Sequence, residues 1–277
     1  MIKNTDVTVP DLFVAISNYL DCSCEYFPSM QSDEPLMEAY HMARDRGQKE
    51  GFIPVFVVID DFRSDNLNAE DINKKSATGE GAEYRQKLLS TTLEDGKETL
   101  DKILKEYKER MEEYGMSPDE LEGMFGDEDI DLEELGEMLD MDEFELAEMS
   151  DDEQSESFYG LKNGDKTNPA LLVEVPVKNP WEIFAYLPFG GWNECPDPET
   201  HMAVSKYWYE KYDAVPAVIT MDTLEFLLPA PVPEEQAMEL AKEQYVYCTD
   251  IVDQGIGEVH LLAKTLCQSK IWFFWWD

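Results

Sequence analysis

The sequence is poor in basic residues, and this shortage restricts what the protein can bind. Its 277 residues include 22 Lys and Arg against 61 Asp and Glu, which gives a formal net charge of -39. A surface of this charge is repelled by nucleic-acid phosphates and by anionic lipid, so we expect no direct binding to nucleic acid or to a membrane. The electrostatically favoured partner is a basic protein. A high net charge also keeps a protein soluble without any specific partner, and this second interpretation stays open.

Long apolar runs and a cysteine framework are also lacking. The longest apolar run covers residues 52–59 and is too short to cross a bilayer. The N-terminal residues do not have the layout of a secretory signal, which needs a small-residue cleavage site after its apolar stretch. The five cysteines are an odd number and, apart from Cys22 and Cys24, they are scattered, as expected of reduced thiols. These features predict a soluble, cytoplasmic protein.

Sequence motifs for common chemistries are absent as well. The chain contains no G-x-G-x-x-G, Walker A, G-x-S-x-G or H-E-x-x-H pattern. Residues 127–138 have acidic side chains at the first, third and fifth positions of a calcium loop. Leu132 and Met138, however, stand where such a loop needs Gly and Glu. Cys22 and Cys24 are too close in sequence for a zinc knuckle. We therefore expect no cofactor and no bound metal.

Hydrophobic periodicity predicts an α+β fold with a mixed β-sheet covered by helices. Helical stripes occupy residues 10–20, 35–50, 80–90, 93–114, 199–212, 233–248 and 257–268, with a short helix at 181–187. Strand-like runs occupy residues 52–59, 170–177, 215–221, 223–228 and 271–276. Both faces of the last run are apolar, which predicts a strand inside the sheet rather than at its edge.

Three segments are expected along the chain. Residues 1–110 carry helices and one buried strand that contribute to the main fold, and residues 161–277 form the C-terminal core. Between them, residues 111–160 contain no Lys or Arg and about twenty acidic residues, a block whose charges repel one another. Leu132, Leu135 and Met138 have helical spacing, which predicts a largely helical insertion. An acidic-hydrophobic segment that orders on binding a partner is the alternative.

Residues 190–201, GGWNECPDPETH, are the leading candidate site. This loop offers donors, acceptors and a thiol: Trp192, Asn193, Glu194, Cys195, Asp197 and His201. Residues 250–255 add Asp253 and Gln254. Cys195, His201 and Asp253 together suit a thiol nucleophile with a general base. The alternative is structural: Asp197 would cap a helix that begins at Pro198.

Several irregular motifs resemble a bacterial family known only as domain of unknown function 4253. They are residues 180–187, GGWNECPDPETH, KYWYEKY, VPAVITMDTLEF, EQYVYC with DIVDQG, and the terminal WFFWWD, with residues 38–60 resembling a companion segment of longer members. The resemblance covers most of the chain outside the acidic stretch. It implies a fold that spans both ends of the chain, and it implies no activity.

The expected function is that of a non-catalytic binding or regulatory protein that recognises a basic partner. A specific version is an immunity or antitoxin-like protein that neutralises a basic toxin. The alternative is an enzyme with a pocket formed by Cys195, His201 and Asp253. A third hypothesis is a DNA mimic, which requires acidic side chains spaced like phosphates on an ordered surface.

Overall fold

In the computed structural model, the described residues are 2–3, 8–58, 69–117, 157–187 and 189–277. The chain divides into two compact units. Unit 1 comprises residues 1–99, 157–227 and 273–277, and unit 2 comprises residues 100–156 and 228–272. Most of the predicted acidic insertion, residues 118–156, lies outside the described residues. None of the helices in the described part of the chain is long and apolar enough to span a bilayer.

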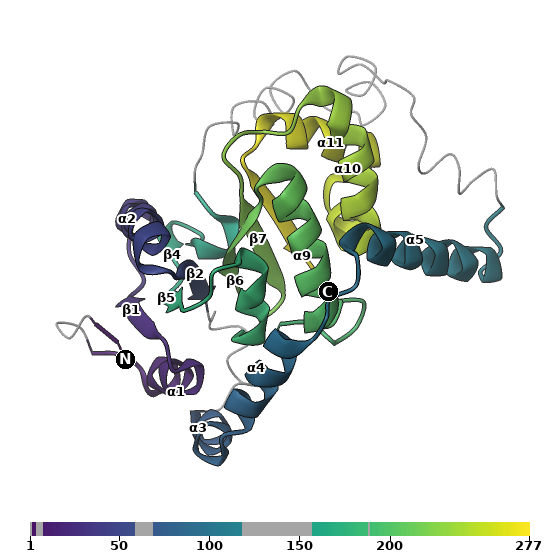
Figure 1. The fold of residues 1–277 in the computed structure, drawn as a ribbon. Helices are drawn as coiled ribbons and strands as arrows, with labels where there is room; N and C mark the ends of the chain where they lie inside the picture. Colours follow the sequence, from purple (N-terminus) through teal and green to yellow (C-terminus); the bar gives the residue numbers. More distant parts are fainter. Residues whose placement is uncertain (1, 4–7, 59–68, 118–156, 188) are drawn as a thin grey trace. The chain divides into compact units, whose positions relative to one another are not determined.

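Unit 1 is built on a mixed sheet in which the described residues form six strands, and it contains all of this sheet except residues 271–272 (Figure 1). Their order is β1-β5-β2-β6-β7-β8. Their bounds are β1 Ser23–Phe27, β2 Ile53–Val58, β5 Ala170–Val175, β6 Val215–Ile219, β7 Thr223–Leu227 and β8 Ile271–Trp275. Strand β5 is antiparallel to β1 and β2, β2 is parallel to β6, and β6 is antiparallel to β7. The predicted α+β class with a mixed sheet is confirmed.

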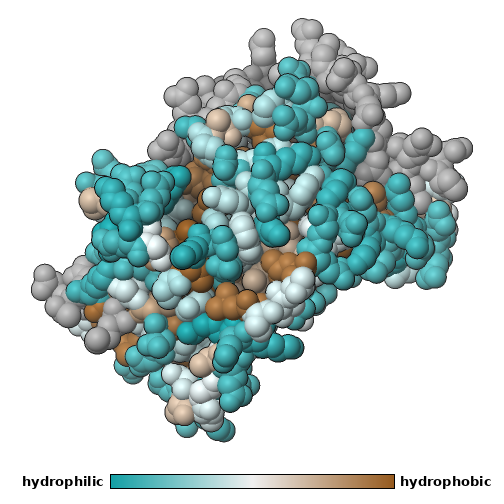
Figure 2. Space-filling model, viewed as in Figure 1, coloured by the Kyte–Doolittle hydropathy of each residue, from teal (hydrophilic) through white to brown (hydrophobic). Residues whose placement is uncertain are grey.

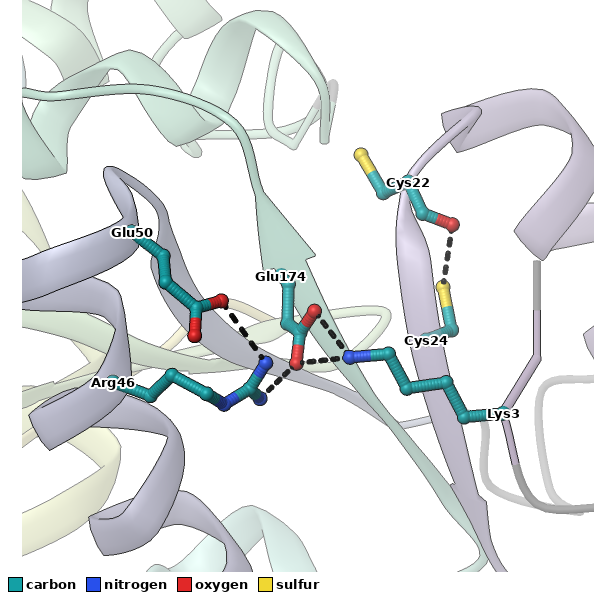
Figure 3. Close-up of polar contacts among 6 residues, drawn as sticks. All are labelled: Lys3, Cys22, Cys24, Arg46, Glu50 and Glu174. Carbon is teal, nitrogen blue, oxygen red and sulfur yellow. Dashed lines mark hydrogen bonds and ion pairs between the residues drawn. The ribbon is translucent and has the colours of Figure 1, made fainter.

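Both N-terminal strands pair with strands from the second half of the sequence. Strand β5 lies between β1 and β2, with Val173 opposite Val55. Glu174 on β5 accepts bonds from Lys3, with Nζ–Oε distances of 2.6 and 2.7 Å, and also pairs with Arg46 (Figure 3). These ion pairs hold the pKa of Glu174 low against the opposing effect of its partial burial. Only one strand was predicted before residue 110, so β1 was missed.

Helices cover both faces of the sheet. The helices of this unit are α1 Asp11–Leu20, α2 Glu34–Glu50, α3 Ala69–Thr78, α4 Glu80–Ser90, η4 Pro180–Ala185 and α9 Pro198–Tyr212. On one face, Tyr40 of α2 stacks on Phe56 of β2 with ring centroids 5.7 Å apart. On the other face, Trp208 of α9 stacks on Phe274 of β8 at 5.5 Å and meets Phe226 of β7 edge-on. These buried aromatic contacts form the core of the unit.

Strand β8 lies at an edge of the sheet, so its predicted interior position is wrong. Within the described residues its neighbour is β7, and no strand lies on its other side. Trp272, Phe274 and Trp276 are buried, whereas Phe273 is 38% exposed although it packs against the ring of Tyr159. Aromatic side chains on both faces of β8 require other parts of the chain to pack on both faces of the sheet. They do not require a second neighbouring strand, and that is why the pattern was misleading.

Unit 2 is helical in its described residues. It contains the part of α5 (Gly96–Glu113) from residue 100 onward, together with α10 (Glu234–Tyr247) and α11 (Val259–Gln268). Between α10 and α11 lies a π-helical turn, η5 (Ile251–Ile256), in which Gly255 departs from helical geometry. Helix α10 carries a buried stripe that includes Leu240, Ala241 and Tyr245. The helices were predicted from periodicity, and the π turn was not.

Candidate functional site

The 190–201 segment follows η4 and ends in the first turn of α9, and both of these helices begin with a cap. At the start of η4, Asn179 and Glu182 form a capping box, in which the Asn179 backbone N–H donates to Glu182 Oε2 at 3.2 Å. At the start of α9, the Asp197 carboxylate accepts the backbone N–H of Thr200 at 2.8 Å, and Pro198 is the first helical residue. This cap confirms the structural interpretation of Asp197.

The loop itself is a tight turn that depends on positive φ angles. Gly190 and Gly191 have φ of 92° and 78°, and Asn193 has φ of 45°. The N–H of Gly191 donates to the carbonyl oxygens of Cys195 and Pro196, at 3.1 and 2.9 Å. A Cβ atom on Gly190 would lie 1.9 Å from the Pro196 oxygen. The close approach of two backbone segments therefore requires glycine at position 190.

This turn brings together two of the predicted chemical groups. The Sγ atom of Cys195 lies 3.6 Å from Nε2 of His201. Both side chains are buried. The His201 ring stacks on Phe184 with centroids 5.2 Å apart, and it also contacts Phe189 and Trp276. The thiol and the imidazole thus lie against a set of aromatic rings, with little access for solvent.

Burial decides the protonation state of this histidine. Removal from water lowers the pKa of His201 to about 3, while the nearby Asp197 carboxylate and a hydrogen bond to the Pro196 carbonyl act in the opposite direction. The imidazole is therefore neutral at pH 7. A general base works best with a pKa near the working pH, so His201 in this setting is a poor proton acceptor. The pair is well placed for packing and badly placed for nucleophilic attack.

The other predicted loop residues form the outer rim of the turn. Asn193 and Glu194 are exposed, as is Asp197, and Trp192 is half-buried with its ring edge-on to Phe189. The Asn193 amide donates to the backbone oxygen of Asp277 at 2.7 Å. The rim is therefore tied to residue 277 and presents carboxylates outward.

The remaining predicted site residues lie in unit 2. Asp253 Oδ1 accepts the hydroxyl of Tyr245 at 2.9 Å, and the Tyr245 hydroxyl oxygen lies 2.9 Å from that of Tyr107. Partial burial raises the pKa of Asp253, and the Tyr245 hydrogen bond opposes that rise. Gln254 donates to Asp250 at 2.8 Å. Because these residues belong to a different unit from Cys195 and His201, the expected convergence with the loop stays a prediction.

One buried acid was not singled out from the sequence. Glu225 in β7 is fully buried, and its carboxylate accepts two backbone N–H groups, from Tyr159 and Gly160. The signal available in the sequence was a single charged residue within the apolar run TLEFL. In the part of the chain that the structure describes, no three His, Cys, Asp or Glu side chains gather as metal ligands.

Comparison with known proteins shows that the C-terminal part of the chain is similar to a known family. Residues 171–277 match the model of a family described as "Domain of unknown function (DUF4253)". The match includes the 190–201 loop, the 250–255 segment and β8. The predicted family resemblance is confirmed for this part of the chain, and residues 38–60 lie outside the match. No curated protein matches the chain, and no solved structure does. The description of the family names no activity, so the function has to be argued from the site.

Proposed function

We propose that this chain is a non-catalytic, cytoplasmic binding or regulatory protein that recognises a basic partner. The observation that carries the proposal is the net charge of -39, together with the carboxylates that the candidate loop presents outward. Opposite charges accelerate encounter between proteins and select among partners. Hydrophilic residues predominate on the face drawn in Figure 2, as expected of a surface that recognises polar groups.

The rim of the 190–201 loop is the part of unit 1 best suited to this role. Glu194, Asp197 and Glu199 are exposed within six residues of one another. Two of these carboxylates also act on α4: burial raises the pKa of Tyr84, and the negative charges of Asp197 and Glu199 raise it further. A negatively charged rim with the half-buried ring of Trp192 suits Lys and Arg side chains, which combine a charge with an apolar stem.

Binding of a Lys/Arg-rich peptide, followed by fluorescence anisotropy at several salt concentrations, tests the proposal. We expect the affinity to fall as salt rises, and a neutral peptide of the same length not to bind. The double variant Glu194→Gln/Glu199→Gln should weaken binding by about 0.5–2 kcal/mol, since each exposed charge pair is worth roughly 0.2–1 kcal/mol.

The matched control is Glu106→Gln/Glu112→Gln, which removes the same charge from exposed positions of α5. Equal losses in both double variants would mean that net charge alone attracts the peptide and that the loop has no special part. Absence of any binding at low salt would remove the proposal.

An enzyme is the second candidate, and the 3.6 Å approach of Cys195 to His201 is the observation in its favour. An activated thiol reacts near neutral pH, whereas a buried and protonated thiol does not. Labelling with a maleimide at pH 7 distinguishes the two. Cys22 is an internal reference, because burial raises its pKa to about 12. Rapid labelling that is lost in Cys195→Ser would favour the enzyme, and labelling as slow as that of Cys22 would exclude it.

A further inference from the structure

The outer edge of the sheet at β1 is occupied by a short segment of the chain that carries a lysine. Strand β1 is the first strand of the sheet, and β5 pairs with one of its sides. On the other side, Ile2 forms a parallel bridge with Cys24, and the Lys3 N–H donates to the Cys24 carbonyl oxygen at 2.7 Å. Residues 2–3 therefore lie along β1 as the beginning of a further parallel strand.

The two side chains of this segment point to opposite faces of the sheet, as successive residues of a strand do. Paired residues share a face, so Ile2 lies on the face of Cys24 and Tyr26. This face is apolar, since the Tyr26 ring packs on Phe13 of α1 with centroids 4.9 Å apart. Lys3 lies on the other face. An extended segment on this edge therefore fits best with apolar residues toward α1 and different residues on the second face.

The second face of this edge carries carboxylates. Alternation places Glu25 on it, and Glu174 of β5 lies opposite Ser23 on the same face. The Lys3 side chain reaches across β1 and donates to both oxygens of Glu174, at 2.6 and 2.7 Å, while Arg46 of α2 pairs with the same carboxylate from the other direction (Figure 3). The Lys3 side chain is 46% exposed, whereas that of Glu174 is 13% exposed. Glu174 is thus a fixed acceptor, and Lys3 is its accessible partner.

We propose that the β1 edge is a docking site for an extended basic segment of a partner protein, which takes the place of residues 2–3. When a strand is added to a sheet edge, main-chain hydrogen bonds supply affinity and alternate side chains supply specificity. Residues 2–3 have the pattern that fits, an apolar side chain toward α1 and a lysine toward Glu174. The inference rests on the proposed recognition of a basic partner and adds a surface separate from the 190–201 loop.

Charge favours such a partner over a second copy of the chain. Two copies, each with a net charge of -39, repel one another, whereas a basic segment is attracted. Residues 2–3 are displaceable, because an ion pair made by an exposed lysine contributes little to stability. A segment with several alternate lysines also brings a cation to Glu25, the second carboxylate on this face of the edge.

A short peptide in which Val and Lys alternate tests the site, with fluorescence anisotropy on the full chain as the readout. The Lys3 N–H donates to β1, so the lysine amides of a peptide in the same parallel position face the strand and the valine amides face away. N-methylation of the lysine residues should therefore abolish binding to the edge. N-methylation of the valine residues leaves charge and composition the same and should preserve binding. Equal binding of the two methylated peptides would overturn the proposal.

Variants of the chain test the competition at Glu174. Lys3→Gln removes the competing lysine and should strengthen binding of the peptide by about 1.4- to 5-fold, the worth of one exposed ion pair. In the Lys3→Gln background, Glu174→Gln should weaken binding by a similar factor. The matched control in that background is Glu50→Gln, which also pairs with Arg46 but lies on α2 and is 55% exposed. It should change the affinity less than Glu174→Gln does. If Lys3→Gln leaves the affinity unchanged, the proposal fails.

The results for the β1 edge and for the 190–201 loop can be told apart. If binding ignores N-methylation and Lys3→Gln but is weakened by Glu194→Gln/Glu199→Gln, the edge proposal is overturned and the loop proposal stands. If binding depends on N-methylation and is unaffected by the loop variant, the edge is supported and the loop is not. Light scattering of the protein alone tests the other occupant. A dimer that dissociates in Lys3→Gln would mean that a second copy occupies the edge, and it would overturn the proposal.

Discussion

Substitution of Gly190 by Ala tests whether close backbone contact builds the candidate loop. The adjacent residue provides the control, because Gly190 and Gly191 both have positive φ, 92° and 78°. A Cβ atom on Gly190 would lie 1.9 Å from the Pro196 oxygen and 2.5 Å from His201 Nε2, whereas a Cβ atom on Gly191 would meet nothing within 4 Å. The two variants share the backbone penalty and differ in the steric contact.

The magnitudes can be worked out separately for the two sites. An alanine in the left-handed region costs roughly 1–2 kcal/mol, and we expect Gly191→Ala to lose about that much stability. In Gly190→Ala the Pro196 carbonyl must also move, although it accepts the Gly191 N–H at 2.9 Å. Forcing an extra methyl group into this packed contact adds roughly 1–3 kcal/mol, so the total is about 2–5 kcal/mol. Such a loss is a large part of the stability of an ordinary domain.

Urea denaturation followed by tryptophan fluorescence suits this comparison. Five of the six tryptophans, all except Trp272, belong to unit 1, so the signal reports mainly the unit that contains the loop. The free energy of unfolding should fall by about 1–3 kcal/mol more for Gly190→Ala than for Gly191→Ala, and urea denaturation resolves such a difference. Equal losses of stability in the two variants would refute the reasoning. They would show that the Pro196 carbonyl moves aside with no loss in the free energy of unfolding.

Two further predictions concern hydrogen bonds described above. Asp197→Ala should destabilise unit 1 by about 1 kcal/mol through loss of the α9 cap, and Asp197→Asn should restore most of it; urea denaturation measures both. Tyr245→Phe should raise the pKa of Asp253, because the Tyr245 hydroxyl now lowers it, and the ¹³C titration of that carboxyl measures the change. An Asp253 titration that is identical in both proteins would show that the bond has no effect on its ionisation.

Sequence reasoning succeeded where a local signal and the tertiary structure agree. Gly51 ends α2 with φ of 82°, as a glycine C-cap should, and α4 has the expected bounds. The Asp197 cap before Pro198 was also recognisable, because both residues are preferred at these positions for local reasons.

Sequence reasoning failed where distant parts of the chain form the environment of a residue. Strand β1 is a five-residue run, SCEYF, and its pairing partner is β5, far along the sequence. Helix α3, AEDINKKSAT, is mainly polar, and it packs against α1 from a distant part of the sequence. The closeness of Cys195 to His201 was expected, but the pKa of the histidine depends on Phe184, Phe189 and Trp276. No local pattern reports that a ring will be enclosed by three others.

The insertion of β2 beside β5 has a consequence for synthesis of the protein on the ribosome. Val55 pairs with Val173, so the ribosome adds 118 further residues before the apolar strand IPVFVV can form this pair. At roughly 5–20 residues per second this delay is about 6–24 seconds. During that time an unpaired apolar strand is available to chaperones and to other nascent chains. The intervening sequence has many more acidic than basic residues, and its net negative charge opposes aggregation of the unfinished chain.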